Sequence, residues 1–436
     1  MEFVEITGIG SDLQGVGRLS DGRTVFVPGA IPGETVEIEI TADKGRFCEA
    51  SLVRVCVPSP DRVESSCPYA SLCGGCQGRH MTYARTLALK RQVVYDALTR
   101  IGGLTDPTVH ETLGCAQPDR TRNKAEYPIG MQNGRPVIGA HARASRDIVP
   151  LTDCLLQSAE SVRALNAVSD WLKSSPIAGH LKYLVTRVNR EGALMAILCG
   201  DAPLQAEIGR RGPKIPSLHS LWYCHLNRRP THALDGRCTR VSGNPTFRDR
   251  LFDLDFELSP QSFFQVNRAQ AEVLYQAALN ALDLRPGCGL SLLDAYCGAG
   301  TISLSAARMV KTVTGIEIVA PAIENARRNA QINRLENTRF ICADAAREIP
   351  KILAQDQRFD AVILDPPRKG AELALLSALA SAKIPKICYV SCNPATLARD
   401  LKTLCSQNYR FEYTQPVDMF PWTGHVETIC LLTHKD

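Results

Sequence analysis

Five short apolar runs recur between residues 290 and 391, and stretches with helical spacing separate them. The runs cover 290–295, 310–317, 339–342, 359–364 and 387–391. Strand and helix signals that alternate in this way are typical of a doubly wound parallel sheet, so the sequence predicts an α/β fold for this part of the chain. Two further runs, at 411–413 and 426–432, can close the sheet with a hairpin.

Reactive side chains follow several of these runs. In open parallel sheets, ligands bind beyond the carboxyl ends of the strands. The first run leads into a Gly-x-Gly loop at Gly298 and Gly300, and the second ends at Glu317. Asp365 directly follows the fourth run, and Cys392 directly follows the fifth. The sequence therefore predicts a ligand site made of carboxylates, a glycine loop and a thiol. A buried structural cysteine is the alternative for Cys392, because free Cys is among the most buried residue types.

The residues around the glycine loop distinguish between two kinds of cofactor. Gly-x-Gly alone is shared by many nucleotide sites. Here Ser303 replaces the third glycine of the dinucleotide fingerprint, and Asp294 places a carboxylate close to where a pyrophosphate would lie. That carboxylate would repel a dinucleotide but suits S-adenosylmethionine, which carries an ammonium and a sulfonium. Glu317 is placed to accept hydrogen bonds from ribose hydroxyls.

Residues 1–57 have a different pattern. β-Branched residues alternate with charged ones at 36–40, and glycines interrupt a series of short strand-like runs. Strands this short predict a small OB-like β-barrel. A barrel without a ligand is the alternative to an RNA-binding one. Pro58 and Pro60 then mark a linker.

The segment 67–76 gathers three of the chain's 17 cysteines, Cys67, Cys73 and Cys76. In a chain with no export signal, cysteines serve as thiols, metal ligands or catalytic groups more often than as disulfides. Zinc prefers paired Cys-x2-Cys knuckles, whereas an iron–sulfur cluster needs four thiolates and tolerates one remote ligand. Cys154 is the remote candidate, Cys115 competes with it, and zinc is the alternative metal.

The middle of the chain carries weaker signals. Apolar residues recur at helical intervals from 87 to 101, and alternation at 181–188 and 192–198 predicts antiparallel strands. A basic turn at 120–124 can position RNA phosphates, and a solvated charged face is the alternative.

A chain of 436 residues is too long for one hydrophobic core, so we expect two to four domains. The net charge of +5 permits an anionic partner without requiring one. No apolar run approaches bilayer length, and the segment 1–5 is too acidic for a secretory signal. We therefore expect a cytoplasmic protein with no membrane partner, and a monomer.

Two further motifs resemble those of the TrmA-type RNA (uracil-C5-)methyltransferases. The segment 263–267, Phe-Phe-Gln-Val-Asn, is similar to the family's Phe-Phe-Gln-x-Asn motif. The segment 420–427 is similar to its Phe-Pro-x-Thr-x-His-Val-Glu motif, with Trp422 where the family often has His. The resemblance covers essentially the whole chain. The cysteine segment, completed by Cys154 before a Leu-Gln pair, makes it most like the iron–sulfur branch that acts on 23S ribosomal RNA.

The resemblance implies three domains. They are a TRAM-type RNA-binding barrel at 1–57, a mixed central domain with a [4Fe–4S] cluster at 58–258, and a class I S-adenosylmethionine-dependent methyltransferase domain at 259–436. The implied cluster ligands are Cys67, Cys73, Cys76 and Cys154. The residues implied to bind S-adenosylmethionine are Gln265, Asp294, Tyr296, Gly298, Gly300, Glu317 and Asp365.

The resemblance also implies catalytic roles for Cys392 and Glu427. C5 of uracil is a poor nucleophile, so covalent catalysis must supply electron density. The Cys392 thiolate would add to C6, C5 would take the methyl group, and Glu427 would remove the C5 proton so that Cys392 can leave. The uridine must first be flipped out of folded RNA.

Alternative functions differ in which motifs they explain. Cytosine-C5 enzymes carry a second cysteine where this chain has Arg368, which favours uracil, and transfer RNA is the alternative substrate. A nicotinamide-dependent iron–sulfur oxidoreductase would explain the glycine loop and the cysteines but not Asp294, nor Cys392 with Glu427. A non-catalytic RNA-binding protein would explain only the barrel and the basic turn.

Overall fold

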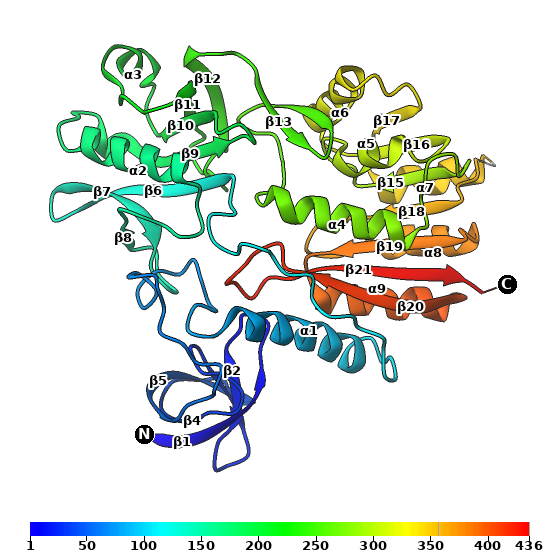
Figure 1. The fold of residues 1–436 in the computed structure, drawn as a ribbon, viewed down its shortest axis with the longest axis horizontal. Coiled ribbons are helices and arrows are strands. Elements are labelled where there is room, and N and C mark those ends of the chain that lie inside the picture. The colour runs from blue at the N-terminus through cyan, green and yellow to red at the C-terminus, as the bar shows by residue number, and fades with distance from the viewer. Residues whose placement is uncertain (356, 436) are drawn as a thin grey trace.

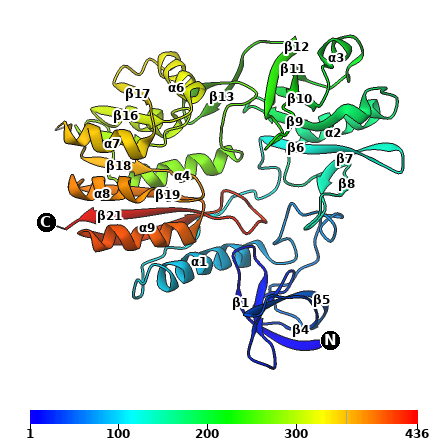
Figure 2. The same ribbon diagram turned by 180° about the vertical axis from the view of Figure 1, so that it is seen from behind.

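The computed structural model describes residues 1–355 and 357–435. An N-terminal barrel, a central sheet and a C-terminal sheet covered by helices follow one another along the chain (Figure 1). The barrel lies below the other two parts in Figure 1, and Figure 2 shows the same arrangement from behind. Within the described residues, no helix combines the length and the apolar content needed to cross a membrane.

Five strands form the closed barrel, in the order β1-β2-β3-β5-β4. Their bounds are β1 (Glu2–Ile9), β2 (Gly15–Arg18), β3 (Thr24–Val27), β4 (Thr35–Asp43) and β5 (Phe47–Val57). Alternation along the strands directs Val4, Ile6, Val36 and Ile38 into the barrel core. The predicted small barrel is confirmed.

The central sheet has seven strands in the order β12-β11-β10-β9-β6-β7-β8. Its strands are β6 (Lys124–Gln132), β7 (Arg135–His141), β8 (Ile148–Pro150), β9 (Leu181–Val188), β10 (Leu194–Gly200), β11 (Leu218–Leu226) and β12 (Gly236–Gly243). The predicted antiparallel pairing of β9 with β10 is confirmed. β10 and β11 run parallel, because α3 (Gln205–Arg211) carries the chain back between them. Helix α2 (Ala159–Leu172) packs on this sheet through Ala164 and Leu165.

The C-terminal sheet also has seven strands, in the order β17-β16-β15-β18-β19-β21-β20. They are β15 (Ser291–Ala295), β16 (Thr312–Glu317), β17 (Thr338–Cys342), β18 (Ala361–Leu364), β19 (Lys386–Ser391), β20 (Tyr409–Val417) and β21 (Glu427–His434). All are parallel except β21, which is antiparallel to both of its neighbours. The predicted doubly wound sheet and its closing hairpin are confirmed.

Helices alternate with the strands of this C-terminal sheet. They are α4 (Arg268–Ala281), α5 (Thr301–Ala307), α6 (Ala320–Ile332), α7 (Ala345–Ala354), α8 (Leu373–Ser381) and α9 (Pro394–Ser406). A two-stranded hairpin, β13 (Phe247–Leu251) and β14 (Leu254–Leu258), precedes α4. The strand order reverses between β15 and β18, which is where such sheets bind ligands.

Helix α1 (Tyr83–Arg100) follows the barrel in sequence but packs beside the C-terminal sheet. Val94 and Leu98 are fully buried in the same core cluster as Leu397 and Leu401 of α9. Both ribbon views show α1 alongside α9 (Figures 1 and 2). The core of the C-terminal sheet thus includes Val94 and Leu98, which belong to the segment 58–258 that was assigned to the central domain. The predicted domain boundaries at 57/58 and 258/259 stay predictions.

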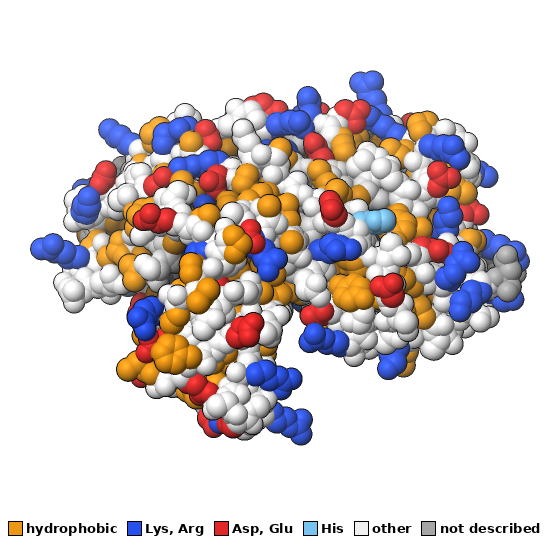
Figure 3. Space-filling model, turned by 60° about the horizontal axis from the view of Figure 1, so that its bottom comes forward, with side chains coloured by type: hydrophobic (Ala, Val, Ile, Leu, Met, Phe, Trp, Pro, Cys, Tyr) orange, Lys and Arg blue, Asp and Glu red, His pale blue; other side chains and the backbone are white. Residues whose placement is uncertain are grey.

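The face that carries the barrel is mixed in charge. Lys and Arg side chains are spread over it with Asp and Glu side chains between them, and a recess separates the barrel from the body (Figure 3). The net charge of +5 therefore does not mark one continuous basic patch on this face.

Candidate active site

Two neighbouring strand ends bring Cys392 and Glu427 together. β19 and β21 pair antiparallel, with Ser391 opposite Thr428. Extended by one position beyond the end of β19, this register would bring Cys392 opposite Glu427, the first residue of β21. The Thr428 hydroxyl donates to the carbonyl oxygen of Ser391 at 2.9 Å, which fixes the two strand ends against each other.

A hydrogen-bonded turn presents Cys392 at the start of α9. The Asn393 backbone N–H donates to Ser391 Oγ at 3.1 Å, and the Asn393 side chain caps α9 by accepting from the Ala395 N–H at 3.1 Å. The thiol is half-buried, unlike that of a structural core cysteine. Burial raises the pKa of Cys392 to about 11, and the carboxylates of Glu427 and Asp365 add to the effect.

Three carboxyl groups at this edge of the sheet resist ionisation. Burial raises the pKa of Glu427 to about 8, that of Asp365 to about 7 and that of Asp294 to about 6. Asp365 raises the pKa of Glu427 further, and Asp294 does the same to Asp365. The three groups therefore form an electrostatically connected row that leads from the glycine loop to Cys392.

The loop after β15 adopts backbone conformations that few residues tolerate. Tyr296, Gly298 and Gly300 have φ angles of 74°, 54° and 83°. The Gly298 N–H donates to Glu317 Oε2 at 3.3 Å, which ties the loop to the end of β16. A Cβ at position 300 would lie 3.1 Å from the Cβ of Ala326, so glycine permits the close approach to α6.

The segment that contains Gln265 approaches the same edge. Burial raises the pKa of Tyr275 on α4, and both the Gln265 side chain and the Asp365 carboxylate act on its hydroxyl. The Asn123 amide donates to the carbonyl oxygen of Gln265 at 2.9 Å. Tyr275 is therefore subject to both residues, and Asn123, which directly precedes β6 of the central sheet, holds the backbone of Gln265.

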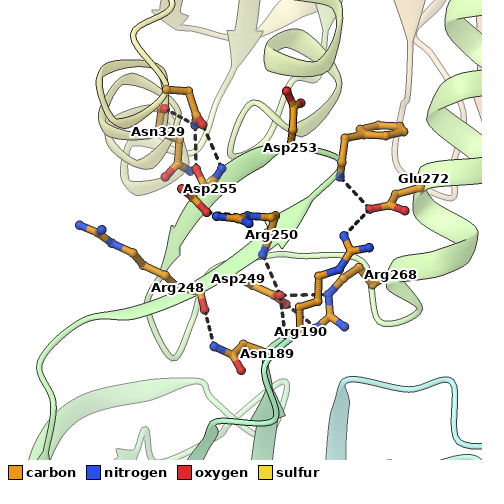
Figure 4. Close-up of polar contacts among 12 residues, drawn as sticks. Asn189, Arg190, Arg248, Asp249, Arg250, Asp253, Asp255, Arg268, Glu272 and Asn329 are labelled. Carbon is orange, nitrogen blue, oxygen red and sulfur yellow. Dashed lines mark hydrogen bonds and ion pairs between the residues drawn. The ribbon is translucent and has the colours of Figure 1, made fainter.

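A polar network behind this segment joins α4 to the central sheet (Figure 4). Arg268, the first residue of α4, forms a bidentate ion pair with Asp249 of β13 at 2.9 and 2.7 Å. Arg190 pairs with Glu272 at 3.0 Å, and its backbone N–H donates to Asp249. We infer that this network fixes the start of α4 and, through it, Gln265. A groove of about 470 Å³ beside the network contains none of the predicted site residues.

Asp294 and Asp365 at the active-site edge would carry poorly compensated negative charge once ionised. Asp294 is fully buried; the Ser303 hydroxyl donates to its Oδ2 at 2.5 Å, and its Oδ1 has no hydrogen-bond partner among the described residues. In that part of the chain, no basic side chain offsets the charge of Asp294 or Asp365. The site therefore fits a ligand with positive charge, such as S-adenosylmethionine.

Comparison with known proteins agrees with this geometry. The family described as tRNA (Uracil-5-)-methyltransferase matches residues 247–435, and the TRAM domain matches residues 3–53. An "Uncharacterized RNA methyltransferase" of Halalkalibacterium halodurans is 37% identical over 451 residues, which cover 100% of this chain and 98% of the relative. Another protein of that name, from Clostridium tetani, is 39% identical over 443 residues and 98% and 95% of the two chains. The chain belongs to the RNA (uracil-C5-)methyltransferase family.

A solved member of the uracil-C5 methyltransferases has the same architecture. The Pyrococcus abyssi tRNA (uracil-54, C5)-methyltransferase, solved in complex with S-adenosyl-L-homocysteine, superposes with a TM-score of 0.75 at 27% identity. The match covers 99% of this chain and 100% of that one. The predicted family, the α/β methyltransferase fold and the N-terminal barrel are thereby confirmed.

The four cysteines predicted to bind a cluster lie near one another. Burial raises the pKa of the Cys73 thiol, and the neighbouring thiols of Cys154 and Cys67 raise it further. Burial also raises the pKa of Cys76 to about 11, with a contribution from Cys154. Cys115, the competing ligand, accepts instead from the Asn267 amide at 3.3 Å.

The cluster itself stays a prediction in this uracil-C5 methyltransferase. Within the described residues, no group of three or more His, Cys, Asp and Glu side chains is arranged to hold a metal ion. In a [4Fe–4S] cube, however, each thiolate binds a different iron, so its ligands stand farther apart than those of a single ion.

Two arginines beside these thiols lack part of their hydrogen bonding. The Nε atoms of Arg79 and Arg122 are buried and have no partner in the described part of the chain. Burial lowers the pKa of Arg122, and the thiols of Cys76 and Cys154 oppose that shift. Arg79 pairs with Asp119 at 2.7 Å, so Arg122 is the buried cation of this region that an anionic group would compensate.

Two side chains of the basic turn at 120–124 form ion pairs within the protein. Arg120 forms a bidentate ion pair with Asp153 at 2.7 and 2.8 Å and donates to the Cys154 carbonyl at 2.8 Å. Lys124 pairs with Glu126 at 2.7 Å. Arg120 and Lys124 are thus engaged within the protein, and the role of this turn in positioning RNA phosphates stays a prediction.

Sequence reasoning missed a buried ion pair that positions the loop before Glu427. Lys90 of α1 and Asp418 are both fully buried and pair with each other, and Lys90 also donates to the Phe420 carbonyl at 3.0 Å. The Tyr83 hydroxyl donates to Asp418 at 2.6 Å. The available signal was a lysine at four-residue spacing from Val94, on the buried side of a helix.

Proposed function

We propose that this chain methylates C5 of a uridine in folded RNA through a transient bond between the Cys392 sulfur and C6 of the base. The main support is the strand register that leaves Cys392 opposite Glu427. A nucleophile for C6 and a base for the C5 proton must reach adjacent atoms of one ring, and this register provides such a pair.

Each step falls to a residue of this edge. Cys392 releases its proton to solvent, and its thiolate adds to C6, which raises the electron density at C5. Burial opposes ionisation of Cys392, and the nearby Arg368 lowers the pKa of the thiol against it. S-adenosylmethionine, when bound, supplies the methyl group. The ionised form of Glu427, whose raised pKa of about 8 makes it a stronger base than an ordinary carboxylate, then accepts the C5 proton, and the C6–S bond breaks to return the thiolate.

The remaining residues would hold the methyl donor. Asp294 and Asp365 provide uncompensated carboxylates for its positive charge. Glu317 ends β16, where it can accept from ribose hydroxyls. Gly298 and Gly300 allow close approach of the backbone, and Tyr296 and Gln265 border the same space.

For the substrate we propose 23S ribosomal RNA, with transfer RNA as the second candidate. The four neighbouring cysteines favour the ribosomal branch by resemblance. The solved neighbour that acts on uracil-54 of tRNA favours the second candidate. In both cases the uridine must leave its stack, which costs least in a single-stranded loop.

The test is incubation with tritiated S-adenosylmethionine and total RNA from cells that lack the enzyme, followed by mapping of the labelled base. Label at C5 of a 23S uridine is expected, and label confined to tRNA would support the second candidate. C392A should abolish labelling while the protein still binds S-adenosylhomocysteine. Unchanged labelling by C392A would refute the covalent mechanism.

We propose further that Cys67, Cys73, Cys76 and Cys154 bind a [4Fe–4S] cluster with a structural role. The buried Arg122, whose Nε has no partner in the described part of the chain, supports an anionic group at this place. Protein purified without oxygen should be brown and contain iron and sulfide in equal amounts. A colourless protein that contains zinc would support the alternative metal.

A further inference from the structure

Three cysteines outside both regions lie side by side on neighbouring strands of the central sheet. Cys199 of β10 pairs with Cys224 of β11, and Cys224 pairs with Cys238 of β12. Residues directly opposite on paired strands point to the same face of the sheet, so the three sulfurs form a row. Cys199 and Cys224 are buried, whereas Cys238 is partly exposed on the edge strand.

We propose that Cys224 and Cys238 form a reversible cross-strand disulfide, a modification site that is independent of the proposed function. Opposite Cα atoms in an antiparallel pair lie about 4.5–5.5 Å apart. Disulfides span Cα separations of about 4.4–6.8 Å, so the bond forms without separating or shifting the strands. Disulfides of non-exported proteins, where they occur, are mostly transient and redox-responsive.

The row also prepares the thiols for exchange. Hydrogen bonds from Cys199 and Cys238 lower the pKa of the central Cys224 thiol. The hydrogen bond that Cys238 makes with Cys224 raises the pKa of Cys238, and burial adds to that effect. The lowered pKa of Cys224 favours its thiolate, which can attack the Cys238 sulfur once the more accessible Cys238 has been modified.

The oxidant we assign is a low-molecular-weight disulfide. The Cys238 thiolate attacks one of its sulfurs, which forms a mixed disulfide and releases one small thiolate. Cys224 then loses its proton and attacks the Cys238 sulfur, which forms the protein disulfide and releases the second small thiolate. Two protein thiols are oxidised, and one small disulfide is reduced to two thiols.

The position of the pair gives the bond a structural consequence. The Gln261 amide donates to the carbonyl oxygens of Leu234 and Gly236, at 3.0 and 3.1 Å, at the start of β12. Gln261 belongs to the segment that leads to Gln265. A bond from Cys238 to Cys224 fixes the strand to which this segment is attached.

The test is equilibration of the native full-length protein with mixtures of reduced and oxidised glutathione, followed by alkylation and peptide mapping. Trypsin places the three cysteines in separate peptides, 191–210, 215–228 and 238–240, so each pairing has its own mass. We expect the linked peptides 215–228 and 238–240 to accumulate under oxidising conditions and to disappear after reduction by dithiothreitol.

Two variants complete the test. C238S should abolish the linked peptide, whereas C56S, at an exposed cysteine of the barrel, should leave it unchanged. The proposal is overturned if exposed Cys56 and Cys342 of the parent protein become glutathionylated while Cys224 and Cys238 are recovered as separate peptides. A bond between Cys199 and Cys224 alone would also overturn it.

Discussion

The active-site edge and the cysteine region hold buried charge of opposite sign. Asp294, Asp365 and Glu427 gather carboxylates with raised pKa values at the first. At the second, Arg122 places a guanidinium Nε without a partner among the described residues beside the thiols, whereas the neighbouring Arg79 pairs with Asp119. Burial of an uncompensated charge is costly, so each region is arranged for a ligand of the opposite sign.

This contrast shows that buried groups of one charge, left without a partner, indicate the charge of the ligand that binds beside them. The net charge of the whole chain does not. The chain's net charge of +5 is consistent with RNA binding but says nothing of a sulfonium or of an anionic cluster. The charge of the unpaired buried groups distinguishes a site for a cation from a site for an anion. The following variants each remove charge from one region.

The largest effect is expected from E427Q. Without the carboxylate, the C5 proton is not removed, so we expect kcat to fall by about 10²- to 10⁴-fold. Because release of Cys392 then stalls, a covalent protein–RNA complex should accumulate and survive denaturing electrophoresis. E336Q, at an exposed glutamate, is the control. Loss of activity by E427Q without any covalent complex would contradict the assigned role.

R122M tests the cysteine region through the direction of its effect. If an anionic cluster pairs with Arg122, removal of the cation leaves a buried charge unpaired and lowers the free energy of unfolding by about 3–5 kcal/mol. If no anion is bound, removal of a buried unpaired cation raises that free energy. Denaturant unfolding with iron content measured in parallel distinguishes the two.

R120M is the matched control for R122M. Arg120 is partly exposed and paired with Asp153, and exposed pairs contribute only about 0–1 kcal/mol. Equal effects of R120M and R122M would show that burial of the cation is not what matters.

D365N should weaken binding of S-adenosylhomocysteine or S-adenosylmethionine. Loss of one charged contact costs about 1.5–3 kcal/mol, or roughly 10- to 100-fold in Kd. In the parent, affinity for the cationic S-adenosylmethionine should rise as pH increases through about 7, because Asp365 ionises there. Calorimetric titration from pH 6 to pH 8 should show a flatter profile for D365N. An unchanged pH profile would remove Asp365 from the binding role.

The smallest effect concerns stability and pH. Burial raises the pKa of Glu427 from 4.5 to about 8, so the folded state holds this proton more tightly than the unfolded state. The resulting stability is present below pH 4.5 and is lost as pH rises through about 8. The Tm of the parent relative to E427Q should therefore fall by about 2 °C or more between pH 5 and pH 9. A constant difference would show that Glu427 is not buried as a protonated acid.

Local sequence patterns were sufficient for much of the catalytic part. The apolar runs, the glycine loop and the strand-end residues Asp365 and Cys392 are each contained in a few consecutive residues. The periodicity of apolar residues follows burial directly, so the seven strands of the C-terminal sheet were predictable from it. The Phe-Phe-Gln and His-Val-Glu motifs were recognised in the same way.

Contacts between distant segments were not predictable, because they depend on strand register and on packing. The sequence alone determined which residues could carry chemistry: Cys392, Glu427, the carboxylates and the cysteines. Only the tertiary structure decided that Glu427 lies opposite Cys392, that Lys90 of α1 pairs with Asp418, and that the basic turn binds Asp153. The physical reason is that pairing is fixed by hydrogen bonds and buried contacts among residues far apart in the chain, whereas sequence patterns report only each residue's own neighbourhood.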